Sequence, residues 1–183
     1  MTSKPIWIAL FSQTGSELRE IEKAIGVSPT IVMTNSKVFT DTSWNVTSTL
    51  MRKTHNEIVE WLSLSYPDEE VRKRVMITLH GYLRILPPSI CDRYEIYNGH
   101  PALISQYPEL KGKDPQVRTW QNNSQYPIIG SVVHRCVAEV DAGEIVSSVA
   151  YTNRVESQDE MFTRLKQSSF EAWYWFMRKK LCV

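Results

Sequence analysis

Continuous apolar runs alternate with amphipathic segments in the first half of this 183-residue chain, and that alternation limits the folds open to it. Residues 5–11, 30–33 and 75–79 are almost entirely apolar, with threonine as the polar residue at 30 and 78, as is typical of strands buried on both faces. Residues 17–25 and 55–64 carry apolar side chains at helical spacing, and Gly26 follows the first of these segments as a stop signal. Strands that alternate with helices pair in parallel through right-handed crossovers. We therefore expect an α/β fold with a Rossmann-like, mostly parallel, twisted sheet flanked by helices.

The pattern changes in the last third of the chain. Residues 128–137 and 144–151 read as an antiparallel strand pair whose loop turns on Gly143, and residues 158–180 read as a terminal helix. Residues 44–49 have a weak strand signature, 103–115 read as a loop, and the paired prolines 87 and 88 start a short helix. Because we find no repeat, low-complexity segment or linker, we expect residues 1–183 to form a single domain.

Composition excludes several function classes. With 21 basic and 20 acidic residues the net charge is +1, so no overall field favours a nucleic acid polymer or a membrane. No apolar run approaches the roughly 20 residues needed to cross a bilayer, and residues 5–11 are too short for a signal peptide. Cys91, Cys136 and Cys182 have no metal-ligand spacing and suit a reducing compartment. We expect a cytoplasmic protein without a metal site.

A short polar motif lies at the predicted end of one strand. Asn98 and His100 are two residues apart, so in an extended segment both side chains point to the same face. An amide beside an imidazole can stabilise an oxyanion while a proton moves. Taken alone, an Asn-Gly pair is more often a turn, and His100 before Pro101 can be an ordinary surface histidine.

Other motifs fall at neighbouring strand ends, which is where open parallel sheets bind ligands. The turn at Gly15 follows the first strand, and residues 83–86 follow the strand at 75–79. The loop at Asp141 can reach the same edge from the C-terminal strand pair. Taken alone, Asp141-Ala-Gly143 is an ordinary hairpin turn.

Together these motifs resemble the folate-dependent formyltransferases, in particular the glycinamide ribonucleotide transformylases. The resemblance covers nearly the whole chain and rests on the order of four motifs: Gly81-Tyr-Leu-Arg-Ile-Leu86, Asn98-Gly-His100-Pro101, Lys111-Gly112 and Gly130-x-x-x-His134-x-x-Val137-x-x-x-Asp141-x-Gly143. It implies an enzyme of one-carbon metabolism that transfers a formyl group from 10-formyltetrahydrofolate to a primary amine. The partners implied are thus the reduced folate and a small-molecule amine.

The resemblance also implies residue roles. The catalytic residues are expected to be Asn98, His100 and Asp141, with Asp141 keeping His100 protonated for oxyanion stabilisation. The folate is expected to contact Leu83, Arg84, Ile85, Leu86, Val140, Ala142 and Gly143. The acceptor amine compound is expected at Thr14, Gly15, Ser16 and Glu17. His134 matches a strand histidine whose role is more structural.

The departures from the family pattern concern the acceptor. Glu17 stands where the family has an asparagine beside the substrate phosphate, and Ser169 stands where a glutamate holds ribose hydroxyls. The arginine that pairs with the phosphate has no clean match near His55 and Asn56. These changes favour a different amine, such as a nucleotide, a nucleotide sugar or a similar metabolite.

Three alternatives stay open. The chain can be a phosphoribosylglycinamide formyltransferase of purine biosynthesis, a formyltetrahydrofolate hydrolase with water as acceptor, or a catalytically silent binding protein of the same fold. The first is disfavoured by Glu17 and Ser169, and the last by the presence of Asn98, His100 and Asp141. The oligomeric state is left open, a homodimer included.

Overall fold

The protein is described by a computed structural model covering residues 5–40, 44 and 47–182. The chain divides into two compact units. The first unit consists of residues 1–98 and 136–138, and the second of residues 99–135 and 139–183. The expectation of a single domain stays a prediction.

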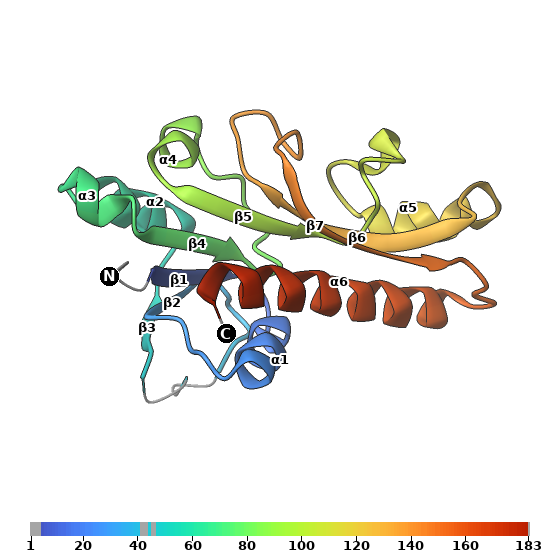
Figure 1. Cartoon of the computed structure of the whole chain (residues 1–183), viewed down its shortest axis with the longest axis horizontal. Helices are drawn as coiled ribbons and strands as arrows, with labels where there is room; N and C mark the ends of the chain where they lie inside the picture. The colour runs from blue at the N-terminus through green and yellow to red at the C-terminus, as the bar shows by residue number, and fades with distance from the viewer. Residues whose placement is uncertain (1–4, 41–43, 45–46, 183) are drawn as a thin grey trace. The chain divides into compact units, whose positions relative to one another are not determined.

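The first unit carries the parallel strands. Its strands are β1 (Ile6–Phe11), β2 (Ile31–Thr34), β3 (Thr49–Arg52), β4 (Val75–Leu79) and most of β5 (Glu95–His100), and its helices are α1 (Ser16–Ile25), α2 (His55–Leu64), α3 (Glu69–Arg72) and α4 (Pro88–Arg93) (Figure 1). β1 pairs in parallel with β2 on one side and with β4 on the other. All five residues of β4 are buried, which explains why four of them are apolar.

Local sequence signals fix the ends of the first two helices. α1 ends at Gly26, whose φ of 69° is the left-handed conformation that glycine adopts at low cost. α2 begins with a capping box, in which the Thr54 side chain accepts from the Glu57 amide while the Glu57 carboxylate accepts from the Thr54 amide. These signals act through neighbouring residues, so the sequence predicted both helices.

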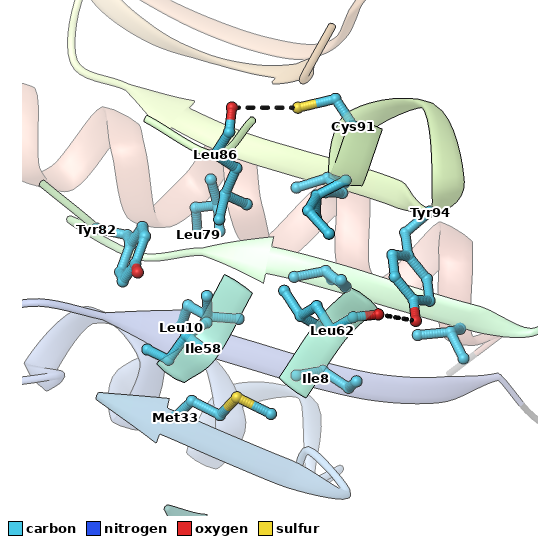
Figure 2. Close-up of a cluster of buried hydrophobic side chains, with 14 residues drawn as sticks. Ile8, Leu10, Met33, Ile58, Leu62, Leu79, Tyr82, Leu86, Cys91 and Tyr94 are labelled. Atoms are coloured by element: carbon cyan, nitrogen blue, oxygen red, sulfur yellow. Dashed lines mark hydrogen bonds between the residues drawn. The ribbon is translucent and has the colours of Figure 1, made fainter. Parts of the chain in front are cut away.

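Buried apolar side chains from the strands and from α2 and α4 form one cluster in this unit (Figure 2). Ile8, Leu62 and Ile96 have no exposed surface, and the Tyr94 ring is 2% exposed. The Tyr94 hydroxyl lies 2.7 Å from the Leu62 carbonyl oxygen and 2.9 Å from that of Ser65. The tyrosine thus ties the chain before β5 to the end of α2.

The second unit is built on the antiparallel pair of β6 (Ile128–Arg135) and β7 (Ile145–Thr152), against which α6 (Gln158–Leu181) packs (Figure 1). The Ser131 hydroxyl lies 3.0 Å from the Leu165 carbonyl oxygen and joins β6 to α6. The unit also contains the 3₁₀ turns η1 (Pro108–Leu110) and η2 (Asn123–Gln125) and the helix α5 (Pro115–Gln121). On α6, Trp173 is fully buried and Trp175 is 59% exposed, so the two side chains point in different directions.

Among the described residues the sheet has seven strands in the order β3-β2-β1-β4-β5-β6-β7. The four neighbouring pairs from β3 to β5 are parallel, and β6 and β7 are antiparallel. This confirms the predicted α/β class: a mostly parallel sheet flanked by helices, with a C-terminal antiparallel strand pair and a terminal helix.

Two local predictions were wrong, and one short helix was not predicted. The strand predicted at 44–49 starts only at Thr49, and residues 45 and 46 lie outside the described residues. The predicted loop at 103–115 contains η1 and runs into α5, and the charged stretch 68–74 contains the short helix α3. Each missed element is short, so its apolar residues are too few to establish a period.

In the described part of the chain no helix is both long and apolar enough to cross a membrane. Within the same residues, no group of three or more histidine, cysteine or acidic side chains is arranged to hold a metal ion.

Candidate active site

The imidazole of His100 is buried at the end of β5 in a fixed tautomer. Its side chain is 5% exposed, and Nε2 lies 2.9 Å from the carbonyl oxygen of Leu110. A carbonyl oxygen only accepts, so Nε2 carries the proton of this hydrogen bond. The nitrogen left to gain or lose a proton is therefore Nδ1.

The carboxylate of Asp141 faces that second nitrogen. Its Oδ2 accepts a hydrogen bond from the Gly112 amide at 2.8 Å and lies 3.4 Å from Nδ1 of His100. The structure thus brings together two of the three expected catalytic residues, 41 positions apart in sequence. Because 3.4 Å exceeds the usual 2.7–3.2 Å of an N–H···O bond, Nδ1 remains available to a substrate atom.

The turn that presents Asp141 differs from the expected one. Asp141 itself has a φ of 53°, the left-handed conformation, whereas Gly143 is not among the residues with positive φ. Gly143 is needed for a different reason: a Cβ atom there would lie 1.8 Å from the carbonyl oxygen of Arg135. The glycine allows close backbone approach next to the hydrogen bond from the Arg135 amide to the Glu144 carbonyl oxygen at 2.8 Å.

A second buried imidazole contacts the same carboxylate. Nε2 of His134 lies 3.3 Å from Oδ1 of Asp141, and the His134 side chain is 2% exposed. Its Nδ1 lies 3.1 Å from the carbonyl oxygen of Arg135 and donates to it. The resemblance implied a more structural role for His134. Its contact with Asp141 could not be predicted from the sequence, because it depends on the conformation of the turn that carries Asp141. Each oxygen of Asp141 therefore faces one imidazole nitrogen.

Burial and charge set the ionisation of this cluster. Burial lowers the pKa of His100, outweighing the Asp141 carboxylate and the Leu110 carbonyl, which raise it; His134 and Arg118 lower it further. For Asp141, burial alone would raise the pKa, but the hydrogen bonds from His134 and the Gly112 amide and the two imidazoles together lower it. These directions favour an ionised Asp141 beside a neutral His100, whereas the expected protonation of His100 stays a prediction.

Asn98 lies two residues before His100 in β5 and is half-buried. A Cβ atom on the intervening Gly99 would lie 2.4 Å from Nε1 of Trp173, so the close approach of α6 requires glycine there. Asn98 belongs to the first unit, and its convergence with Asp141 stays a prediction.

The residues expected to bind folate lie in two loops, one in each unit. In the first unit, Leu83 and Ile85 are 65% and 70% exposed and Arg84 is exposed, whereas Leu86 is buried. The Leu83 amide donates to the Ser12 hydroxyl at 2.9 Å and anchors this loop. In the second unit, Val140 is 46% exposed, Ala142 is exposed and Gly143 is half-buried. Their joint binding of a pterin stays a prediction.

The turn expected to bind the acceptor lies between β1 and α1. Gly15 has a φ of 67°, and a Cβ atom on it would lie 2.8 Å from the Trp44 ring, so both conformation and space require glycine. Thr14 and Ser16 are joined by a hydrogen bond between their hydroxyl groups at 3.1 Å. Both are exposed.

Glu17 follows them and is held by a buried histidine. Its Oε2 lies 3.2 Å from Nδ1 of His80, whose side chain has no exposed surface. Nε2 of His80 lies 2.9 Å from the Thr78 hydroxyl, which also accepts a hydrogen bond from Nε1 of Trp7 at 2.8 Å. A buried polar chain thus runs from β1 and β4 to the first turn of α1, and no pattern in the sequence predicted it.

Comparison with known proteins identifies the family. The family model described as formyl transferase matches residues 66–174, which include Asn98, His100 and Asp141. The chain belongs to the formyl transferase family. It is 29% identical over 105 residues to the phosphoribosylglycinamide formyltransferase of Dictyostelium discoideum. That match covers 51% of this chain and 50% of the relative, so the aligned region spans about half of each.

Solved structures of this formyl transferase fold are similar along nearly the whole chain. The phosphoribosylglycinamide formyltransferase of Anaplasma phagocytophilum matches with a TM-score of 0.76 at 20% identity, over 96% of this chain and 86% of that one. The formyltetrahydrofolate deformylase of Pseudomonas syringae pv. tomato matches with a TM-score of 0.77 at 17% identity, over 98% of this chain and 62% of that one. At such identities the likeness concerns the fold.

Proposed function

We propose that this formyl transferase family member is an N-formyltransferase that moves a formyl group from 10-formyltetrahydrofolate to a primary amine of a small metabolite. Family membership supports formyl transfer. The observation that carries the proposal is the contact between the buried imidazole of His100 and the carboxylate of Asp141, 3.4 Å apart. A neutral imidazole beside an ionised carboxylate is a pair suited to take a proton from an attacking amine.

In the proposed reaction the amine nitrogen attacks the formyl carbon and the carbonyl oxygen becomes an oxyanion. Nδ1 of His100 accepts the proton lost by the amine, because Nε2 is already bonded to Leu110. The imidazolium formed is stabilised by Asp141 and returns the proton to the tetrahydrofolate nitrogen as the carbon–nitrogen bond breaks. The Asn98 amide donates to the oxyanion, and a well-placed donor of this kind contributes about 3 kcal/mol.

The folate substrate is proposed to lie against the loops at 83–86 and 140–143. Exposed large apolar side chains are the natural contacts for a flat ring, and Leu83, Ile85 and Val140 are all at least 46% exposed. Arg84, between the first two, would meet the negatively charged end of a folate.

The acceptor is proposed to carry no phosphate at the first turn of α1, unlike glycinamide ribonucleotide. A helix N-terminus ordinarily favours a bound anion, but here the carboxylate of Glu17 occupies the first turn. The contact with His80 holds this carboxylate in place, so it cannot simply turn away. A nucleotide or nucleotide sugar that presents an amine or hydroxyl groups to this turn fits better than a phosphate.

The test is turnover of 10-formyltetrahydrofolate, followed by absorbance, with a panel of aminated nucleotides, amino sugars and glycinamide ribonucleotide. Asn98→Ala and Asp141→Asn should each lower transfer about 100-fold or more while the protein stays folded. Asp92→Asn, on exposed surface, is the control. Normal transfer by a folded Asp141→Asn variant would remove the pair from the mechanism. Release of formate without any amine would indicate hydrolysis instead.

A matched pair of variants tests the acceptor class. Glu17→Gln should improve the use of glycinamide ribonucleotide relative to unphosphorylated amines, because it removes the negative charge at the turn. Glu20→Gln, one turn along α1 and exposed, should not. Efficient use of glycinamide ribonucleotide by the unmodified protein would contradict the proposed acceptor.

A further inference from the structure

The side chain of Arg118 hydrogen-bonds to residues 109–111, which adjoin the contacts of His100 and Asp141. Arg118 lies on α5 and is half-buried. Its Nη1 donates to the carbonyl oxygen of Glu109, and its Nη2 donates to those of Leu110 at 3.0 Å and Lys111 at 2.7 Å. In the part of the chain that the structure describes, Arg118 makes no ion pair with a carboxylate. Its positively charged guanidinium therefore interacts with these three backbone carbonyl oxygens.

The segment 109–112 makes one hydrogen bond to His100 and one to Asp141. The Leu110 carbonyl oxygen accepts from Nε2 of His100 at 2.9 Å, and the Gly112 amide donates to Oδ2 of Asp141 at 2.8 Å. The Leu110 oxygen thus accepts from both His100 and Arg118. Displacement of this short segment would disturb the imidazole and the carboxylate together.

The geometry of the arginine matters more than its charge. Glu109 and Leu110 lie in η1 and Lys111 directly follows it. A planar guanidinium presents five N–H groups in a fixed fork to these three carbonyl oxygens, whereas an ammonium group presents three donors from a single nitrogen. The Nε–H of Arg118 is buried with no acceptor among the described residues. The side chain therefore adopts a position that leaves one of its own donors unsatisfied while it holds the segment.

We propose that Arg118 is a positioning residue for formyl transfer: it holds the carbonyl groups of 109–111 so that Leu110 fixes the His100 tautomer and Gly112 fixes the Asp141 carboxylate. This inference rests on the proposed function, although its effect on the imidazole can be measured without any turnover. Arg118 contacts neither substrate nor the reacting atoms in this role. It acts through the segment.

Three variants distinguish the effects of the guanidinium hydrogen bonds, of the positive charge and of overall stability. Arg118→Met removes both the hydrogen bonds and the charge. Arg118→Lys keeps the charge but loses the guanidinium hydrogen bonds to residues 109–111. The matched control is Arg93→Met, because Nη2 of Arg93 also donates to two backbone carbonyl oxygens, those of Ser65 at 3.1 Å and Tyr66 at 3.4 Å, in the first unit. Arg93→Met removes comparable hydrogen bonds, but from the carbonyl oxygens of Ser65 and Tyr66 and not from those of residues 109–111.

The first readout is the imidazole itself. The chain has four histidines, so nitrogen-15 NMR can assign the His100 signals with one His100→Asn reference spectrum. In the unmodified protein and in Arg93→Met, neutral His100 should be protonated at Nε2; in both Arg118 variants this preference should weaken. Asp141, His134 and Arg118 are the charged or titratable groups that face His100. Arg118→Met should therefore also raise the pKa of His100, whereas Arg118→Lys should change it less.

The second readout is turnover. Both Arg118 variants should lower kcat at least 10-fold, with Arg118→Met near 100-fold and the KM for the folate within about threefold, because a shift of about 1 Å at a catalytic group costs on that order. Wild-type kcat in Arg118→Lys with an unchanged His100 tautomer would overturn the proposal, as would an effect confined to KM. If the unmodified protein transfers no formyl group, the NMR readout still decides whether Arg118 positions His100.

Discussion

Replacing Gly143 by alanine adds one methyl group where the backbone leaves no room for it. The new Cβ atom would lie 1.8 Å from the carbonyl oxygen of Arg135, and real Cβ atoms essentially never come within 3.0 Å of such an atom. The neighbouring atom is backbone in β6, so no side chain can rotate away. The two segments must separate by about 1.2 Å, the difference between these distances.

This movement has two consequences of predictable size. The hydrogen bond from the Arg135 amide to the Glu144 carbonyl oxygen, 2.8 Å long, would be stretched or broken, and such strain typically lowers the free energy of unfolding by about 1–3 kcal/mol. Asp141 lies two residues before Gly143. A displacement of about 1 Å would take its carboxylate away from the Gly112 amide and His100, so turnover should fall about 100-fold.

The experiment is urea unfolding and formyl-transfer kinetics of Gly143→Ala beside Gly26→Ala. Gly26, at the end of α1, also has a positive φ, but a Cβ atom there would meet nothing within 4 Å. Gly26→Ala should lower the free energy of unfolding by about 1 kcal/mol and leave kcat unchanged. If Gly143→Ala unfolds and turns over like the unmodified protein, the close approach of the 139–144 turn to β6 is not as described and the reasoning fails.

Three further predictions concern charge and local structure. Burial lowers the pKa of His100 from its ordinary 6.5, and the neutral imidazole is the proposed base, so kcat/KM should fall on the acidic side only below pH 6.5. Asp141→Asn removes a group that raises this pKa and should move the fall in kcat/KM to still lower pH. A fall in kcat/KM that sets in above pH 6.5 would contradict the neutral base. His134→Phe should raise the pKa of Asp141, measured by carbon-13 NMR, because the hydrogen bond from His134 lowers this pKa. The ionised carboxylate stabilises the folded state above its unfolded pKa of about 3.8, and in the variant this stability should be lost at a higher pH on acidification. An unchanged pKa of Asp141 would exclude the contact with His134. Thr54→Ala should lower the free energy of unfolding by about 1 kcal/mol in urea through loss of the capping box of α2, and a difference below 0.3 kcal/mol would argue against that cap.

Local signals made much of the fold predictable. β4 was predicted with its observed ends because its short, mainly apolar run lies between the basic residues 72–74 and the His80-Gly81 pair, which a buried strand explains best. α6 was predicted within one residue at its C-terminal end because its apolar residues keep one period over many turns. α5 was missed because seven residues hold too few apolar positions for a period, and α5 carries Arg118.

The sequence by itself determined the alternating α/β architecture, the strand end that carries Asn98 and His100, and the turn that carries Asp141. These follow from hydrophobic period and turn chemistry, which act between residues close in the chain. Only the tertiary structure decided that Nε2 of His100 donates to the Leu110 carbonyl oxygen and that burial lowers the pKa of this imidazole. It alone also decided that His134 contacts the Asp141 carboxylate, that Asp141 takes the left-handed conformation, and that Arg118 hydrogen-bonds to residues 109–111. Ionisation and tautomer depend on burial and on carbonyl oxygens brought near by the fold, and those contacts join residues that no local pattern relates.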